Sequence, residues 1–206
     1  MTDPQEMSHQ ATPTPERRPR DAVVLVDEQD RPLGVEAKLK AHEAGGRLHR
    51  AFSVFLFDAA GRMLLQRRAT TKYHFGGLWT NACCSHPQWG EDVVSGAKVR
   101  LREELGVVAD LSEAFTFVYR ADDPASGLTE HEFDHVLFGQ FDGRPEPDPA
   151  EVDGWRWVDP YELSRDVAAH PERYTPWFRI ALDQVQRRQN LIHEGARRGT
   201  KDEKKD

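Results

Sequence analysis

The chain has 206 residues, of which 38% are apolar, so it suits one domain with a hydrophobic core and short tails better than two full domains. Its net charge of −7 excludes a global basic surface that would hold nucleic acid or an anionic membrane. No aliphatic run approaches the roughly 18 residues of a membrane-spanning helix, and the N-terminus lacks the apolar segment of a secretory signal, so we expect a cytoplasmic protein.

The first predicted elements are strands. Residues 1–20 are rich in proline and charge and poor in apolar groups, so we expect a disordered N-terminal tail. Two apolar stretches, 22–26 and 32–36, flank a polar turn and predict an opening hairpin. The stretches 51–57 and 62–67 flank a turn that ends in glycine, which predicts a second hairpin.

The middle of the chain combines one helix with further strands. Apolar residues recur every three or four positions over 92–105, and Gly106 follows as a C-terminal cap, so this stretch is predicted to be helical. Aromatic residues alternate with other types over 115–120, which is the period of a strand. The stretches 136–141 and 155–158 predict two more strands.

The last part of the chain predicts two short helices. Asp159 and Thr175 each stand before a proline, the arrangement of a capping side chain followed by the first helical position. We expect the domain to cover residues 21–189 and the charged stretch 190–206 to form a C-terminal tail. Helices that cover a mixed β-sheet give an α/β sandwich as the predicted fold class.

Three histidines and two acidic residues form a candidate metal site. They are His42, His49, His86, Glu130 and Glu132. In an extended segment Glu130 and Glu132 project to the same side while His131 faces away. This donor set suits Mn²⁺, Mg²⁺ or Zn²⁺, whereas a structural zinc finger would need a second cysteine pair. With 9 histidines and 35 acidic residues in the chain, a chance grouping remains an alternative.

Cys84 is the candidate reactive thiol, because it precedes His86 by two residues. A thiol at this position can be a nucleophile, an acid–base group or a buried small apolar side chain. The surroundings typical of cysteine proteases are absent. Cys83 is its direct neighbour, closer than a relaxed disulfide allows, so we expect two free thiols.

The segment 90–106 partly matches the Nudix box, in which glutamates on one helix bind Mg²⁺ for diphosphate hydrolysis. When the two are aligned on Glu103 and Glu104, the Arg-Glu pair of the box falls on Val99 and Arg100. A cation therefore replaces one metal-binding carboxylate. Glu103 and Glu104 can also be a solvated helix end, since the spacing from Arg100 to Glu104 is that of an ordinary helical salt bridge.

Several motifs follow one another over about residues 22–185. They are Leu48-His49-x-Ala51-Phe52-Ser53, Arg67-Arg68-Ala69, Trp79-Thr80-Asn81-x-x-Cys84-x-His86-Pro87, Glu103-Glu104-Leu105-Gly106, Tyr119-Arg120-Ala121, Glu130-x-Glu132 and Pro176-Trp177. Together they resemble type 1 isopentenyl-diphosphate isomerase. The resemblance implies a Nudix-like α/β/α sandwich that isomerises isopentenyl diphosphate to dimethylallyl diphosphate for isoprenoid biosynthesis. The implied route is protonation at C4 and deprotonation at C2 through a tertiary carbocation.

The resemblance also implies a role for each matched residue. Cys84 and Glu132 would form the acid–base pair, with Tyr119 near Glu132. The first divalent ion would bind the five residues grouped above: His42, His49, His86, Glu130 and Glu132. A Mg²⁺ bound with the substrate diphosphate would contact Glu104 and the backbone carbonyl of Cys84. The implied substrate contacts are Lys38, Arg68, Lys72, Arg100 and Trp177.

Two other functions are weighed against the isomerase. The first is a Nudix-type diphosphate hydrolase, which the replacement at Val99 and Arg100 disfavours. The second is a diphosphate-binding module without catalysis, which would need neither Cys84 nor Glu132. We expect a small isoprenoid diphosphate as the partner, no nucleic acid and no membrane, and a monomeric protein.

Overall fold

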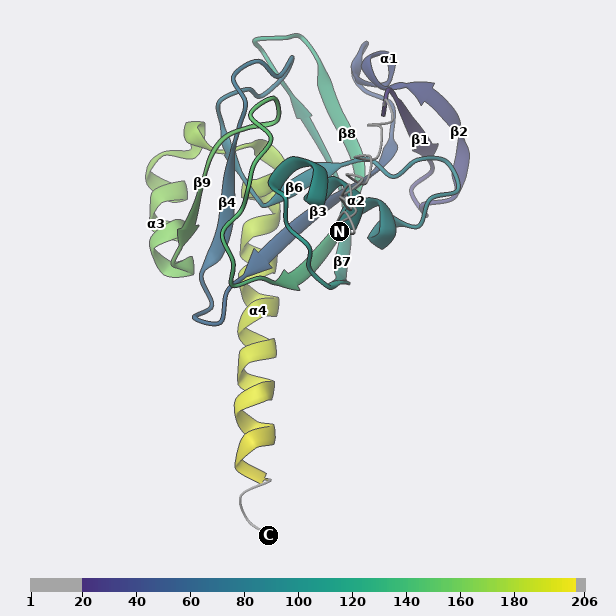
Figure 1. Cartoon of the computed structure of the whole chain (residues 1–206). Coiled ribbons are helices and arrows are strands. Elements are labelled where there is room, and N and C mark those ends of the chain that lie inside the picture. Colours follow the sequence, from purple (N-terminus) through teal and green to yellow (C-terminus); the bar gives the residue numbers. More distant parts are fainter. Residues whose placement is uncertain (1–19, 203–206) are drawn as a thin grey trace, which may run out of the picture.

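The structure, a computed structural model, describes residues 20–202. Its elements follow in the order β1 (Ala22–Val26), β2 (Pro32–Ala37), α1 (Lys38–His42), β3 (His49–Phe57), β4 (Met63–Arg68), β5 (Trp79–Thr80), β6 (Cys83–Ser85), α2 (Val93–Leu105), β7 (Leu111–Asp122), β8 (Thr129–Gln140), β9 (Val152–Val158), α3 (Pro160–Ala169), the 3₁₀ turn η1 (Pro171–Arg173) and α4 (Pro176–Asp202). The predicted α/β fold with a mixed sheet is confirmed, and it forms one domain (Figure 1).

Strand β3 is the centre of the sheet. It runs parallel to β8 and antiparallel to β1, β4 and β6, which makes the sheet mixed. Successive side chains of a strand point to opposite faces. Phe52, Val54 and Leu56 accordingly pack in the core beneath α2, whereas Phe55 and Phe57 pack in the core beneath α4. The sheet is therefore covered by a helix on each face.

The opening hairpin of β1 and β2 is confirmed, but the second predicted hairpin is confirmed only at its turn. Strands β3 and β4 pair through Phe57 and Met63 and then separate. Strand β6 takes the place beside β3, with Ser53 opposite Cys84, while β4 pairs with β5 and β9. The residues of β6 are too few to show a strand period, so its pairing with β3 could not be predicted from the sequence.

Helix α2 confirms its predicted start and end. The Asp92 side chain accepts a hydrogen bond from the backbone of Ser95, and Gly106 adopts the left-handed conformation at φ 65°. Arg100 and Glu104 lie one turn apart on the helix, and both side chains are buried. The helix therefore presents this pair to the interior rather than to solvent.

The expectation of two short closing helices was wrong for the second one. Helix α4 has 27 residues and continues past residue 189 to Asp202, extending away from the body in Figure 1. Its first turns are held by apolar residues at helical spacing that are buried in the core: Trp177, Phe178, Ala181, Leu182 and Val185. Good helix formers such as Arg and Gln continue it, because helix propensity does not require burial.

Thr175 directly precedes α4. Its hydroxyl donates a hydrogen bond to Thr80 Oγ1 at 2.9 Å.

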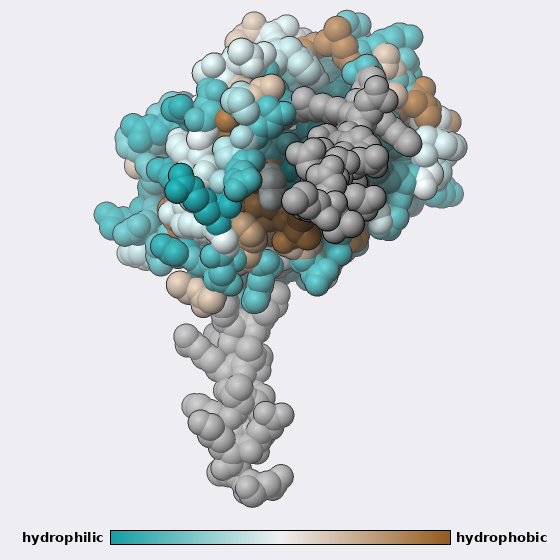
Figure 2. Space-filling view, viewed as in Figure 1, coloured by the Kyte–Doolittle hydropathy of each residue, from teal (hydrophilic) through white to brown (hydrophobic). Residues whose placement is uncertain are grey.

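The surface is mostly polar on the face shown in Figure 2, where hydrophobic residues form separate small areas. Among the helices of residues 20–202, none is long and apolar enough to cross a membrane. The predicted N-terminal tail lies almost entirely outside the described residues, and the division of the chain into a domain and two tails stays a prediction.

Candidate active site

Three of the predicted histidines meet Glu132. His49 begins β3 and lies directly opposite Glu132 of the parallel strand β8. His86 follows β6, and its Nε2 lies 2.9 Å from Glu132 Oε1 and 3.3 Å from His49 Nε2. His42 ends helix α1, and its ligand atom lies within 4.8 Å of those of the other three residues. All four side chains are buried.

Glu130 lies on the same face of β8 as Glu132, because residues two apart on a strand share a face. It extends the cluster through a contact with His42. The Glu130 Oε2 atom lies 2.9 Å from His42 Nε2. Its other oxygen, Oε1, contacts Nε2 of His74. His74 was not predicted as a site residue. It lies in the loop between β4 and β5, where no strand or helix period shows which way a side chain points.

The geometry of this cluster fits a divalent metal ion. The Nδ1 atoms of His42 and His49 donate to the backbone carbonyls of Lys38 and Arg47, at 2.6 Å and 2.7 Å. Each ring therefore turns the lone pair of Nε2 toward the cluster, as metal-binding histidines do. Ligand bonds of about 2.1 Å place neighbouring donor atoms about 3.0 Å apart in octahedral geometry. Four of the separations within the cluster lie between 2.9 and 3.5 Å, and the ligand atoms of His42, His49, His86 and Glu132 all lie within 4.8 Å of one another.

The charge states also suit metal binding. Burial and the charge of Lys38 lower the pKa of His86 to about 3, so its imidazole is neutral. Burial and the charge of Glu130 oppose ionisation of Glu132, but its contacts with His49 and His86 outweigh them and lower its pKa to about 2. Neutral imidazoles and ionised carboxylates are the forms that bind divalent ions. The buried His/Glu cluster is therefore compatible with a divalent metal site.

Tyr119 lies beside Glu132, on the neighbouring strand. The two residues are directly opposite each other in the antiparallel pairing of β7 and β8. The Tyr119 hydroxyl donates to Glu132 Oε2 at 2.6 Å. Burial, followed by the charge of Glu132, raises the pKa of Tyr119 well above its usual value, so the hydroxyl keeps its proton. Glu132 thus has one oxygen near the histidines and the other at a phenol.

Cys84 is held by polar contacts that the sequence did not show. Its Sγ lies 3.0 Å from Asn81 Oδ1, and Trp177 Nε1 donates to Sγ at 3.1 Å. The Asn81 amide nitrogen donates to two backbone carbonyls, which fixes its oxygen toward the thiol. Behind the thiol, Ser53 Oγ lies 3.6 Å from Sγ and donates to the buried Asp134. Burial and the charge of Asp134 raise the pKa of Cys84 to about 12, so it is a thiol at neutral pH.

Glu104 and several cations form the opposite part of the site. Arg100 Nη2 lies 2.6 Å from Glu104 Oε1, and Gln66 donates to Glu104 Oε2 at 3.4 Å. Lys72 forms an ion pair with Glu151, whose other oxygen lies 3.5 Å from Arg100 Nη2. Gln66 and Glu151 were not among the predicted residues. Their surrounding strand and turn patterns gave no reason to choose them over other polar residues.

Arg68 and Lys38 complete the cationic lining. Arg68 donates to the backbone carbonyls of His74 and Phe75, both at 3.2 Å, and its guanidinium lies 5.4 Å from the centre of the Trp177 ring. The Lys38 ammonium lies 5.8 Å from the centre of the Tyr73 ring. The cations therefore line the same cavity as four carboxylates, which are those of Glu104, Glu130, Glu132 and Glu151.

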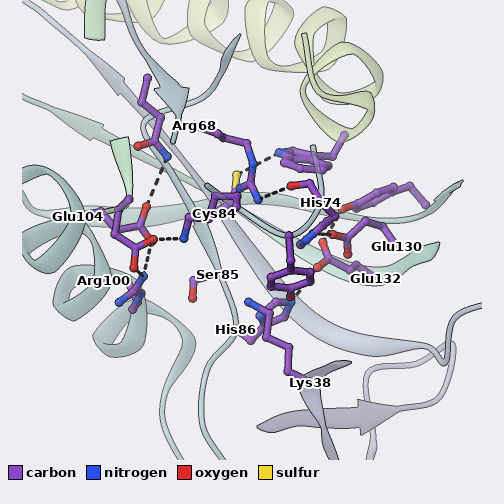
Figure 3. A pocket seen from close by; sticks show the side chains of 16 residues that line it. Lys38, Arg68, His74, Cys84, Ser85, His86, Arg100, Glu104, Glu130 and Glu132 are labelled. Carbon is purple, nitrogen blue, oxygen red and sulfur yellow. Dashed lines mark hydrogen bonds and ion pairs between the residues drawn. The ribbon is translucent and has the colours of Figure 1, made fainter. Parts of the chain in front are cut away.

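The predicted residues meet in one pocket of about 580 Å³, part of it open to solvent (Figure 3). His42 and His49 belong to the histidine cluster but do not line the pocket. All other predicted site residues line it: Lys38, Arg68, Lys72, Cys84, His86, Arg100, Glu104, Tyr119, Glu130, Glu132 and Trp177. His74, Tyr73, Gln66, Ser85 and Glu151 line it as well. A thiol, ionised carboxylates and a group of cations thus face a common space.

Known proteins resemble this chain in fold. The NUDIX domain model matches residues 47–178. A Deinococcus radiodurans protein of known crystal structure aligns with a TM-score of 0.59 at 22% identity, covering 72% of this chain and 89% of that one. A MutT protein from Methanosarcina mazei aligns with a TM-score of 0.57 at 15% identity, covering 68% and 94%. At these identities the likeness concerns the fold alone.

Curated proteins are similar over most of the sequence. Isopentenyl-diphosphate Delta-isomerase 2 of Aromatoleum aromaticum is 54% identical over 165 residues, which is 80% of this chain and 86% of that protein. The isopentenyl-diphosphate Delta-isomerase of Nocardia farcinica is 54% identical over 78% of this chain and 92% of its own length. That of Serratia proteamaculans is 47% identical over 77% and 87%. The chain therefore belongs to the isopentenyl-diphosphate Delta-isomerases built on the NUDIX fold, the type 1 family.

Proposed function

We propose that this chain interconverts isopentenyl diphosphate and dimethylallyl diphosphate in isoprenoid biosynthesis, with Cys84 and Glu132 as its acid–base pair. The observation that carries the proposal is that a partly buried thiol and a buried carboxylate face one pocket whose lining also holds four cationic side chains. These cations are Lys38, Arg68, Lys72 and Arg100. Such a pocket offers cations that can bind an anion and, in the same space, groups that can transfer a proton.

The reaction needs one proton added at C4 and one removed from C2, because an isolated alkene has no carbonyl to stabilise a carbanion. Cys84 and Glu132 suit this exchange, since one holds a proton at neutral pH and the other does not. The two residues lie on either side of β3, because β6 and β8 pair with its opposite edges. Both side chains line the pocket, so a substrate in the pocket can lie between them. Tyr119, 2.6 Å from Glu132, provides a further proton next to the carboxylate.

The intermediate of this route is a tertiary carbocation. Trp177 stands beside Cys84, and its ring already contacts the Arg68 guanidinium at 5.4 Å. An aromatic face stabilises a desolvated cation by about 2 kcal/mol. We assign Trp177 to this contact. Because water would capture the cation, we expect the substrate to fill the pocket and displace its solvent.

The diphosphate belongs at the end of the pocket where Arg100 and Glu104 lie. A Mg²⁺ that arrives with the diphosphate would take Glu104 and the backbone carbonyl of Cys84 as its protein ligands. This agrees with the preference of Mg²⁺ for one or two carboxylates plus substrate phosphates. Arg68, Lys72 and Arg100 would bind the remaining phosphate oxygens, together with Lys38.

The histidine cluster is the proposed site of the second divalent ion. His42, His49, His86, Glu130 and Glu132 would hold it. When bound, such an ion neutralises the buried carboxylates and keeps Glu132 ionised. Three imidazoles with two carboxylates suit Mn²⁺, Mg²⁺ or Zn²⁺.

A Nudix-type hydrolase and a binding module are the competing functions. The hydrolase is disfavoured by Arg100, which occupies a carboxylate position of the Nudix box and pairs with Glu104 at 2.6 Å. The binding module would need neither the partly buried thiol of Cys84 nor the hydrogen-bonded pair of Tyr119 and Glu132.

Incubation of the purified chain with isopentenyl diphosphate, followed by product analysis, distinguishes the three functions. We expect dimethylallyl diphosphate, loss of the conversion on addition of a chelator, and recovery with Mg²⁺ and Mn²⁺. Release of phosphate from a diphosphate substrate would support the hydrolase. Tight binding of isopentenyl diphosphate without any conversion would support the binding module.

A further inference from the structure

His74 is a buried histidine next to the proposed metal site, to which no role has been assigned so far. Its side chain is 6% exposed. Its Nε2 contacts Oε1 of Glu130, while the other oxygen of the same carboxylate, Oε2, lies 2.9 Å from His42 Nε2. The two carboxylate oxygens of Glu130 therefore have separate partners, one in the histidine cluster and one outside it.

We propose that His74 is a positioning residue that donates its Nε2 hydrogen to Glu130 Oε1 and thereby directs Oε2 to the metal ion. The proposal rests on the metal site assigned above and adds a residue to it. A carboxylate can only accept a hydrogen bond when ionised, so the proton of this contact belongs to His74 Nε2. A nitrogen that donates in this way has no lone pair for the ion. His74 thus acts through Glu130 rather than as a ligand.

The loop that carries His74 is held by hydrogen bonds to its backbone. The Arg68 side chain donates to the backbone carbonyls of His74 and Phe75, both at 3.2 Å. The backbone nitrogen of Phe75 donates to Asp123 at 3.3 Å, and Phe75 itself adopts the left-handed conformation at φ 49°. These contacts fix the main chain directly after the His74 ring, at the His74 carbonyl and at Phe75. An imidazole on a fixed loop can orient a carboxylate, whereas one on a loose loop would only follow it.

The His74 ring has Glu130 as its hydrogen-bond partner, since Nδ1 is buried without a partner among the described residues. Three rings lie close to it, with centroids 4.3 Å away at Tyr73, 5.5 Å at His42 and 5.6 Å at Phe75. A histidine that served only to fill space would not need a polar atom in this position. Partners of this kind, which hydrogen-bond to metal ligands, typically change metal affinity 10- to 100-fold when removed.

Three variants of the full chain test the proposal by Mn²⁺ affinity, measured in competition with a fluorescent chelator. His74→Leu removes the donor and keeps an apolar group of similar bulk. His74→Gln keeps a nitrogen donor at the same number of bonds from Cβ. His131→Leu is the matched control, because His131 is the neighbour of Glu130 that contacts Gly46 instead. The absorption spectrum of the Co²⁺-loaded proteins reports whether the set of ligands has changed.

We expect His74→Leu to weaken Mn²⁺ binding about 10- to 100-fold. We expect His74→Gln and His131→Leu to stay within about threefold of the unaltered chain, and all Co²⁺ spectra to keep the same shape. Equal losses in His74→Leu and His74→Gln with an altered spectrum would overturn the proposal in favour of a ligand role. Unchanged affinity in His74→Leu would also overturn it. An unaltered chain that binds no Mn²⁺ would instead remove the metal site itself.

Discussion

Cys83 and Cys84 are chemically identical neighbours whose surroundings separate their roles. Cys83 is buried in the core beneath α2, and Cys84 packs on the side of α4 beside the pocket. The alternation of a strand places consecutive side chains on opposite faces, so Cys83 faces the core and Cys84, the proposed acid–base group, faces the pocket. The pKa values of both thiols are raised above the usual value, first by burial. Cys84 differs in that its sulfur has polar partners in Asn81 and Trp177.

The exchange of each cysteine for alanine tests this separation. We expect Cys84→Ala to lower the isomerisation rate by about 10²- to 10⁴-fold, the usual contribution of an acid–base group. Cys83→Ala removes one buried sulfur, so we expect a loss of about 1 kcal/mol in unfolding free energy with most of the activity retained. Turnover assays and urea unfolding of both variants measure the two effects. Equal losses of turnover would contradict the assignment of Cys84.

The histidine ligands are tested through bound metal as well as turnover. His42→Ala and His49→Ala each remove one donor whose Nδ1 is already fixed by a backbone carbonyl. We expect both variants to contain less metal by elemental analysis and to turn over more slowly, because a five-residue site loses a direct bond. If both retained the metal content of the unaltered chain, the two residues would be structural histidines.

At the scale of elements, the sequence predicted best where one period persists over several residues. The alternation around Glu130 and Glu132 and the 3.6-residue period of α2 placed candidate residues on the correct faces. Loops have no such period, so His74 was missed although it contacts Glu130. The two residues of β5 and the three of β6 were missed for the same reason, since their strand pairing depends on partners distant in sequence.

The end of the last helix could not be predicted from amino-acid composition. Residues beyond 189 are poor in apolar groups, yet α4 continues to Asp202. A helix that is anchored at one end by buried residues such as Phe178 and Val185 can continue on propensity alone. The exact partners of the proposed catalytic groups, such as Asn81 beside Cys84, depend on tertiary packing that no local pattern contains.

Tyr174 lies at the junction between α3 and α4, and its contribution to stability is expected to depend on pH. The Tyr174 hydroxyl donates to Asp166 and accepts from Arg156 at 2.9 Å. Burial, followed by the hydrogen bond to Asp166, raises the pKa of Tyr174 from 10.0 to about 12. In the unfolded chain the phenol ionises near pH 10. The stability that its neutral form contributes is therefore present below pH 10 and is lost as the pH rises toward 12.

Tyr174→Phe should accordingly be less stable than the unaltered chain at pH 7, by about 1 kcal/mol for the lost hydrogen bond. Between pH 10 and 11.5 we expect this difference to shrink, because the phenylalanine variant has no proton to lose at this position. Urea unfolding at pH 7, 9, 10 and 11.5 measures it. A difference that stayed constant or grew with pH would contradict the role given to Tyr174.

At the scale of the whole molecule, one acidic chain gathers its functional cations around a single pocket. The net charge of −7 cannot attract a diphosphate from a distance, so binding depends on local contacts such as those of Arg68 and Arg100. The mixed sheet brings together residues from β3, β6, β7 and β8, and the helices on its two faces add Arg100, Glu104 and Trp177. The site therefore depends on the complete fold rather than on one motif.

Removal of the metal should destabilise the whole domain, because the proposed ion binds the folded chain and leaves buried histidines and carboxylates uncompensated when it is absent. A ligand at 100 times its Kd contributes about 2.7 kcal/mol, which corresponds to about 5 to 10 °C in Tm for a domain of this size. Thermal unfolding with chelator and with added Mn²⁺ measures the shift. Identical Tm values in the two conditions would show that the cluster binds no Mn²⁺.

The most direct test of the central claim is turnover of isopentenyl diphosphate in D₂O, with the product analysed by NMR. If the chain adds a proton at C4 and removes one from C2, deuterium must enter the methyl group of dimethylallyl diphosphate, because the acid exchanges with solvent. No phosphate should accompany this incorporation. Release of phosphate or pyrophosphate in step with substrate loss, without deuterium in the product, would contradict the isomerase and favour a diphosphate hydrolase.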